Sequence, residues 1–190
     1  MKIFLQRNDK KIALIFFIFT LVFLVLFLSN KEFVDWAYSR HQNVLSWYIR
    51  PLFIIPICFF AYKKSLCGMS LTIFALFTSM FWFNTPTEVA PAIEEFLAFE
   101  KSYTFGAWDF QKIFLSLSVP LFFYLLILAF WKRKLKYGII IIIGAAVLKI
   151  IWSVVFAGDS GASIIKPAVT GLFICLVAVY MFARKKKRKS

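Results

Sequence analysis

Lys149 is the residue in this sequence whose type and position point most directly to chemistry. It stands in a continuous apolar run, eight residues before Ala157, and therefore about 12 Å from that end of a helix. A lysine side chain reaches only about 6 Å toward a membrane interface. An unpaired ammonium at such depth costs about 2.5 to 3.5 kcal/mol. Lys149 is therefore predicted to face other helices and to have a partner.

Two further cations, Arg50 and Lys166, lie near the outer ends of other apolar runs, and each is followed by proline. Singly, each has the character of an ordinary interfacial cation. Together with Lys149 they predict a cationic pocket that opens outward and binds an anionic small molecule or a lipid headgroup. The aromatic and hydroxyl side chains predicted to line this pocket are Tyr124, Trp152 and Ser153.

The partner of Lys149 is left open by the sequence, because no Asp or Glu lies in any apolar run. Backbone carbonyls freed at prolines, hydroxyls, a non-protein anion, or an acid from an outer segment (Glu100 or Asp109) could serve. Glu100 belongs to a predicted amphipathic helix at about 86–101, which starts at a capping box over residues 85–88. The alternative for Glu100 is that the helix frays at this residue.

The elements that must position these residues are membrane-spanning helices. The chain of 190 residues is 62% hydrophobic, 20% aromatic and 17% charged, with mean hydropathy +0.80, which excludes a disordered chain, a disulfide scaffold and a water-soluble enzyme. Crossing a bilayer takes about 20 apolar residues. Runs of this kind lie at about 12–29, 44–62, 66–83, 113–131, 138–157 and 163–183.

The predicted fold is therefore an all-α integral membrane bundle of six transmembrane helices, forming one domain over residues 1–190. The helix at 86–101 lies outside the membrane between the third and fourth spans. Two alternatives stay open. The first run could be a signal peptide, although it lacks a small-residue cleavage site, and the second, interrupted by Pro51 and Pro56, could be re-entrant or kinked.

Charge distribution predicts the orientation of the bundle. The formal net charge is +14, and in the six-span arrangement most Lys and Arg residues fall on the side of the two termini. The acids fall on the other side, with Asp9 as the exception. By the positive-inside rule, both termini are predicted to be cytoplasmic.

The basic C-terminal tail is predicted to attract anionic lipids. Its residues are Arg184, Lys185, Lys186, Lys187, Arg188 and Lys189. The tail has no interleaved aromatic residue and no recognisable module for nucleic acid, so no nucleic-acid partner is predicted, whereas a homo-oligomer or a protein partner is compatible with the sequence. His41 is the only histidine, and the cysteines form no CxxC motif, so no metal and no cofactor are predicted.

Two segments resemble a family of small bacterial polytopic membrane proteins with no established activity. They are Phe81–Pro86 leading to Phe96–Glu100, and Leu148–Gly158, and the likeness covers about a third of the chain. The resemblance implies a bacterial inner membrane and adds no catalytic role.

Three functions are compatible with the sequence. The first is binding or transport of an anion or lipid headgroup at the Lys149 pocket, with the helix that carries Glu100 as a lid. The second is a non-catalytic assembly subunit in which Lys149 only fixes packing. The third, a lipid-acting enzyme using Glu94, Glu95, Glu100 or Asp109, is the least favoured, because adjacent Glu94 and Glu95 point about 100° apart on a helix. No catalytic residue is predicted.

Overall fold

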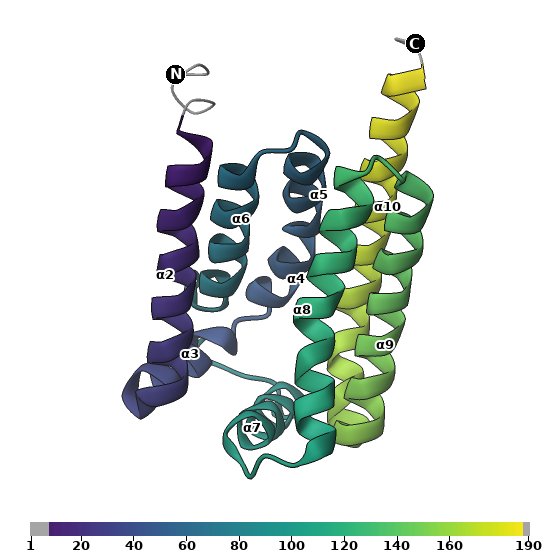
Figure 1. Ribbon diagram of the computed structural model, residues 1–190. Helices are drawn as coiled ribbons and strands as arrows, with labels where there is room; N and C mark the ends of the chain where they lie inside the picture. The colour runs from purple at the N-terminus through teal and green to yellow at the C-terminus, as the bar shows by residue number, and fades with distance from the viewer. Residues whose placement is uncertain (1–7, 188–190) are drawn as a thin grey trace. The chain divides into compact units, whose positions relative to one another are not determined.

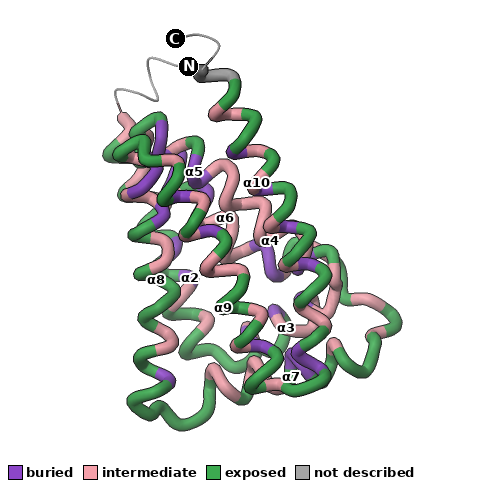
Figure 2. Tube along the Cα trace, turned by 90° about the vertical axis from the view of Figure 1, so that its right-hand side faces the viewer, coloured by how far each residue is buried: buried purple, intermediate pink, exposed green. Residues whose placement is uncertain are grey.

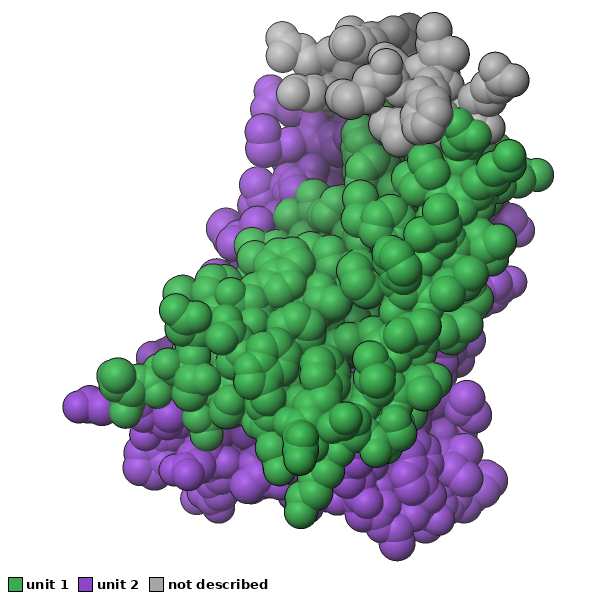
Figure 3. All heavy atoms as spheres, turned by 90° about the vertical axis from the view of Figure 1, so that its left-hand side faces the viewer, with its two compact units in different colours: residues 1–87 green, residues 88–190 purple. Residues whose placement is uncertain are grey.

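The computed structural model describes residues 8–187, which fold into α-helices joined by short turns (Figure 1). No strand occurs within this range, and the all-α prediction is confirmed. Residue contacts divide the chain into two compact units, residues 1–87 and 88–190 (Figure 3). Each unit is described by itself, and the single domain over 1–190 stays a prediction.

Four stretches are long and apolar enough to cross a membrane, which indicates a multi-pass membrane protein. They are α2 (Asp9–Ser29), the pair α4 (Leu45–Leu52) and α5 (Ile54–Tyr62), α8 (Phe110–Trp131), and the stretch Leu135–Arg184. The last contains two helices, α9 (Leu135–Gly161) and α10 (Ile165–Lys187), joined by the 3-10 helix η2 (Ala162–Ile164). A shorter apolar helix, α6 (Leu66–Thr78), continues into η1 (Ser79–Phe81).

The outward faces of these helices are apolar. Phe17 on α2 is 55% exposed and Leu148 on α9 is 67% exposed, and exposed and intermediate residues alternate along most of α8 and α9 in Figure 2. Water would disfavour so much apolar surface, whereas lipid tails do not. The exposure pattern therefore agrees with helices that cross a bilayer.

In the first unit, α2 packs along α6 through phenylalanine rings. Phe16 and Phe19 each lie about 6 Å from Phe74 between ring centroids, and Phe23 lies 6.1 Å from Phe77.

A carboxylate from within the chain occupies the N-terminus of α6. Asp9, at the start of α2, accepts the N–H of Leu66 at 2.8 Å and that of Cys67 at 3.1 Å. It also accepts the hydroxyl of Ser65 at 2.9 Å. These contacts satisfy N–H groups that have no partner inside the helix and place a negative charge at its positive end.

A helix that the sequence did not predict, α3 (Lys31–His41), follows α2. It begins at Asn30, whose side-chain oxygen accepts the N–H of Phe33 at 2.9 Å, an ordinary N-cap.

The predicted second span is broken at Phe53, where α4 ends and α5 begins. Pro56 has no N–H for the carbonyl of Leu52, and its ring would clash with that carbonyl in a straight helix. The N–H of Phe53 instead bonds the carbonyl of Arg50, three residues back. The segment is therefore an interrupted helix, and its crossing of the membrane as one span stays a prediction.

In the second unit, α7 runs from Pro91 to Phe105, so the predicted start at the capping box of residues 85–88 is wrong. A helix begun there would carry Pro91 in its interior, where proline removes a hydrogen bond and clashes with the preceding turn. At the first helical position the same proline is favourable. Because α7 continues to Phe105, the alternative that the helix frays at Glu100 is also wrong. Its amphipathic, extramembrane character stays a prediction.

The remaining helices form an antiparallel series, α8, α9 and α10 (Figure 1). Asp109 caps α8 by accepting the N–H of Lys112 at 2.7 Å. Near the end of α9, Gly158 has φ 55°, and a Cβ at Gly161 would overlap the carbonyl of Ser153, so two glycines permit this tight turn. The predicted lipid contacts of Arg188 and Lys189, and those of the side chains 185–187, lie outside the described residues.

Candidate functional site

Lys149 forms an ion pair with Glu100. Its Nζ lies 2.8 Å from Glu100 Oε1, which joins α9 to α7. Of the two acids considered as partners, Glu100 is therefore the one that pairs, while Asp109 serves as the N-cap of α8. The Lys149 side chain is 43% exposed and the Glu100 side chain 23%, so the pair is accessible from outside this unit.

Aromatic rings surround the ion pair. The Nζ of Lys149 lies 4.6 Å from the ring centroid of Trp152 and 5.6 Å from that of Phe96, at distances typical of cation–π contacts. Phe99 and Tyr103 pack against Trp152, with centroids 5.8 and 5.3 Å away. These α7 residues recur at three- and four-residue spacing and so share one helix face. We call Phe96, Phe99, Glu100, Tyr103, Lys149 and Trp152 the α7–α9 cluster.

The hydrogen-bonding capacity of Lys149 is not exhausted by this cluster. A lysine ammonium has three N–H donors. Within residues 8–187, Lys149 donates a single hydrogen bond, the one to Glu100. Two donors are therefore available to water or to an anionic ligand.

Two buried hydroxyls in the same unit have no hydrogen-bond partner among the described residues, Tyr103 Oη and Ser153 Oγ. Tyr103 belongs to the α7–α9 cluster, and Ser153 follows Trp152 and is 0% exposed. An unsatisfied buried hydroxyl costs about 1–3 kcal/mol, and such groups are uncommon in native proteins. They mark places where a water or a ligand oxygen would be stabilising.

Lys112 is a buried cation that sequence reasoning missed. It is 4% exposed, donates to the carbonyl of Gly106 at 2.9 Å, and lies 4.6 Å from the ring of Trp108. Its Nζ also lies 5.4 Å from the ring of Tyr103, so it holds the end of α7 and one wall of the cluster. The signal in the sequence is a lysine between aromatic residues at the start of an apolar run.

Lys166 and Tyr124 do not join the cluster. Lys166 is exposed at the start of α10 and Tyr124 is 61% exposed on α8, and neither has a hydrogen bond, ion pair or ring contact with another residue in the described range. Along α9, Lys149 lies twelve residues from Gly161, or about 18 Å, which separates it from Lys166. Their role in ligand binding stays a prediction.

Arg50 belongs to the first unit, where it contacts His41, which in turn contacts Ser46. Its Nη1 lies 3.2 Å from His41 Nε2, and His41 Nδ1 lies 2.8 Å from Ser46 Oγ. Because arginine can only donate, Nε2 accepts and Nδ1 carries the proton. The Nδ1–H group donates a hydrogen bond to Ser46 Oγ, and the Ser46 hydroxyl donates to the carbonyl of Asn43 at 2.7 Å.

This direction of donation excludes a nucleophilic serine. A base that activates serine must accept the hydroxyl proton, whereas His41 donates to Ser46, and Ser46 is 0% exposed. The chain from Arg50 to Asn43 is therefore a structural network. Membership of Arg50 in the predicted cationic pocket stays a prediction.

Groups of three His, Cys, Asp or Glu side chains that could hold a metal ion do not occur in residues 8–187. No family model, curated protein or solved structure matches this chain. The site is therefore interpreted from its own geometry, and the resemblance to the bacterial membrane protein family stays a prediction.

Proposed function

We propose that this chain is a six-helix protein of a bacterial inner membrane that binds or transports an anionic small molecule or lipid headgroup at Lys149. The carboxylate of Glu100 pairs with the Lys149 ammonium when no ligand is bound. The observation that carries the proposal is an accessible ammonium, fixed between aromatic rings, with two of its three donors uncommitted.

The proposed topology counts α2, α4 with α5, α6 with η1, α8, α9 and α10 as six spans. The turns after α5 and α8 carry Lys63, Lys64, Lys132, Arg133 and Lys134. Of the acids of the second unit, Glu88 precedes α7, and the others lie in α7 or at the opposite ends of α8 and α9. This separation of charge supports cytoplasmic termini. It would place the α7–α9 cluster toward the outer face.

In the proposed binding step, an oxyanion of the ligand takes the two uncommitted donors of Lys149 or replaces the carboxylate of Glu100. The ring faces of Trp152 and Phe96 stay in contact with the ammonium group. Because Glu100 holds α7 to α9 by a side-chain bond, its displacement would loosen α7, which would then act as a lid. Tyr103 Oη is a further donor for the ligand.

The test is native mass spectrometry of the gently extracted protein, compared with Lys149→Met. We expect a retained anion or anionic lipid in the wild type and its loss in the variant, while the bundle stays folded. Lys31→Met, which removes a charge at the start of α3, is the matched control and should retain the ligand. Normal retention by Lys149→Met would remove the basis of the proposal.

The second proposal, a non-catalytic assembly subunit, is favoured by one observation: the ion pair is closed within the chain. Glu100→Gln separates the two functions. If Lys149 binds an anion, removing its internal competitor should increase retention, opposite to the effect of Lys149→Met. If the pair only fixes packing, both variants should lower thermal stability and neither should carry a ligand.

A lipid-acting enzyme has less support. Glu94 and Glu95 are exposed on α7, outside the cluster of rings. The serine–histidine pair of the described residues, Ser46 and His41, is oriented against proton abstraction.

A further inference from the structure

The ion pair of the α7–α9 cluster has two accessible members of opposite charge. Lys149 Nζ lies 2.8 Å from Glu100 Oε1, and the two side chains are 43% and 23% exposed. Within the described residues, each is the only ion-pair partner of the other. A ligand that binds Lys149 in place of Glu100 therefore leaves a partly buried carboxylate without a cation, which is unfavourable.

The rings around the ion pair favour a cation over an anion. Lys149 Nζ lies 4.6 Å from the ring centroid of Trp152 and 5.6 Å from that of Phe96. Because the face of an aromatic ring carries negative potential, a wholly anionic ligand would meet both these rings and the carboxylate of Glu100 as unfavourable neighbours. Three more rings lie with their centroids 5.3 to 5.9 Å from that of Trp152: Phe99, Tyr103 and Phe156.

A ligand that carries its own cation avoids both costs. Its anionic group pairs with Lys149 while its cation pairs with Glu100, so one ion pair is exchanged for two and no carboxylate is left alone. The ligand cation can also lie against the ring faces, as the ammonium of Lys149 does. The cluster therefore suits an anionic group and an amine that are joined by a short linker.

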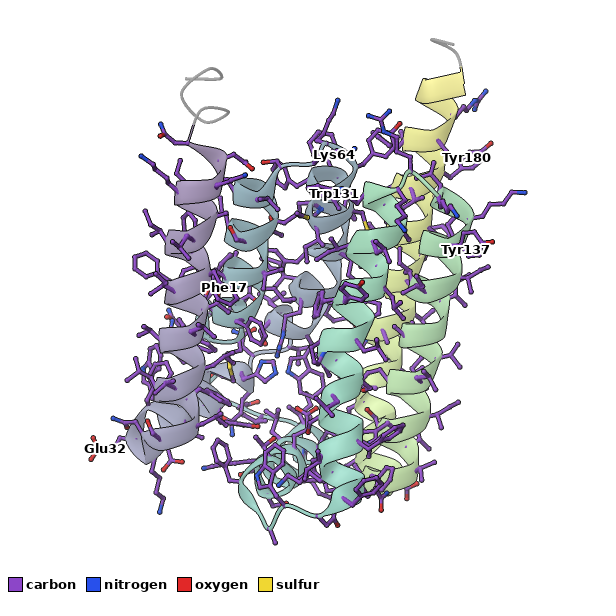
Figure 4. The ribbon with its side chains drawn as sticks, in the orientation of Figure 1. Phe17, Glu32, Lys64, Trp131, Tyr137 and Tyr180 are labelled. Carbon is purple, nitrogen blue, oxygen red and sulfur yellow. The ribbon has the colours of Figure 1, made fainter. Side chains whose placement is uncertain are left out.

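The surroundings of the cluster favour an amphiphilic ligand. On α7, Glu94 and Glu95 are exposed, and exposed carboxylates require water or polar headgroups. On α9, Leu148 and Val155 are the most exposed apolar side chains, at 67% and 68%, and they share a helix face with Trp152 because they lie four residues before it and three after it. Side chains stand out from α9 along its length on the side away from α8 (Figure 4). A polar and a lipid-facing surface thus meet at the cluster.

We propose that the α7–α9 cluster binds the headgroup of a phospholipid that carries a primary amine beside its phosphate, with the phosphate on Lys149 and the ammonium on Glu100. This inference rests on the function proposed above, in which Lys149 binds an anionic group. It adds that Glu100 binds the amine of the ligand. Tyr103 Oη, which is buried and has no hydrogen-bond partner in the described range, is a further donor for the phosphate.

The first test compares two lipids in one sample. The full chain, in mixed micelles with equal amounts of phosphatidylethanolamine and phosphatidylglycerol of identical acyl chains, is examined by native mass spectrometry. Both lipids have the phosphate, and only phosphatidylethanolamine has the amine. The wild type should retain phosphatidylethanolamine in preference, because this lipid supplies a cation for Glu100. Equal retention of the two lipids, or a preference for phosphatidylglycerol, would overturn the inference.

Glu100→Gln should exchange this preference. Retention of phosphatidylethanolamine should fall about fivefold, because its amine loses a partner, while retention of phosphatidylglycerol should rise, because Lys149 loses its internal competitor. Glu95→Gln makes the same change at an exposed position of α7 outside the cluster, and this control should behave like the wild type. Loss of both lipids by Glu100→Gln would assign Glu100 to packing and overturn the inference.

Lys149→Met separates this inference from the proposed function, because both require the variant to lose both lipids. If it retains them at the wild-type level, the proposed function fails, and the inference fails with it. If it loses them while the wild type shows no preference for the amine, Lys149 binds an anion and only the inference fails.

The assignment to a lipid is tested with free phosphoethanolamine, which has the same charged groups without the acyl chains. At a concentration equal to that of phosphatidylethanolamine it should leave the bound lipid in place, because it lacks the apolar contacts with α9. Displacement at equal concentration would assign the cluster to a soluble amino phosphate and overturn the proposal of a lipid.

Discussion

The helices α3 and α7 occupy corresponding places in their units, each preceding a hairpin and packing against its second helix, but they are held differently. On α3, Arg40 donates to the carbonyl of Phe81 at 2.7 Å and to the side chain of Asn84 at 3.2 Å. On α7, Glu100 forms a side-chain ion pair with Lys149 of α9 at 2.8 Å. A backbone carbonyl cannot rotate away from its donor, whereas a carboxylate can.

Further contacts reinforce this difference. Asn43, just after α3, donates to the carbonyl of Asn84 at 3.0 Å, and the rings of Trp36 and Phe81 lie 5.0 Å apart. α3 is therefore attached at several points to backbone that follows α6. α7 is held by ring packing, by the bond from Lys112 to the carbonyl of Gly106 at its end, and by the partly exposed ion pair of Glu100 with Lys149. Of these contacts, the ion pair is the one that an anionic ligand could replace.

The difference between α3 and α7 is tested most directly by removing the contacts of Arg40 and the Glu100–Lys149 ion pair in separate variants. Arg40→Met should destabilise the protein by about 3 kcal/mol, because it leaves a carbonyl and an amide without a charged donor. Glu100→Gln should cost about 0.5 kcal/mol, because the pair is partly exposed. Chemical unfolding in detergent, followed by tryptophan fluorescence, measures both. Equal effects would show that α3 and α7 are held with similar strength.

Two buried serines sharpen the contrast between the units. Ser46 and Ser153 are both 0% exposed, but only Ser46 has hydrogen-bond partners. Ser46→Ala should cost about 1–3 kcal/mol, because the Nδ1–H group of buried His41 loses the Ser46 hydroxyl as its acceptor. Ser153→Ala should be neutral or stabilising in ligand-free protein, because it removes an unsatisfied hydroxyl. A loss of stability in Ser153→Ala would reveal a partner for that hydroxyl, such as an ordered water.

The smallest expected effect concerns the turns after α5 and α8, where Lys64 and Arg133 lie in the left-handed region, with φ of 57° and 58°. Lys64→Gly and Arg133→Gly should each stabilise the protein by about 0.5–1 kcal/mol, since glycine adopts the left-handed region without a Cβ penalty. The two changes should be similar in size, as measured by the shift in Tm. A clear difference between them would mean that the side chain contributes to one turn and not to the other.

Apolar runs predicted the helices well, because a membrane span is a property of local composition. The start of α7 was mispredicted because Pro86 and Pro91 both suit the first position of a helix. Only a helix that begins at Pro91 keeps both prolines out of its interior. α3 was missed because its 11 residues are too few for a membrane span, and its attachment is tertiary, through the bond from Arg40 to the carbonyl of Phe81.

The candidate site was predictable only in part. The depth of Lys149 predicted that it has a partner, and the spacing of α7 placed Glu100 among the candidates. Choosing Glu100 over Asp109 required the capping role of Asp109, which is a contact and not a pattern. Lys112 could not be separated from an interfacial lysine by sequence, because its burial depends on Trp108 and Tyr103 folding over it.

The contact of Asp9 with α6 has a consequence for how the protein is made. It joins residues 56 to 58 positions apart, and a ribosome adding about 5–20 residues per second needs roughly 3–11 s to synthesise that interval. During this time the carboxylate of Asp9 lacks its partners at the start of α6. The contacts that fix α2 against the start of α6 thus form only after the third apolar segment has left the ribosome. The N-terminal unit therefore assembles late in its own synthesis.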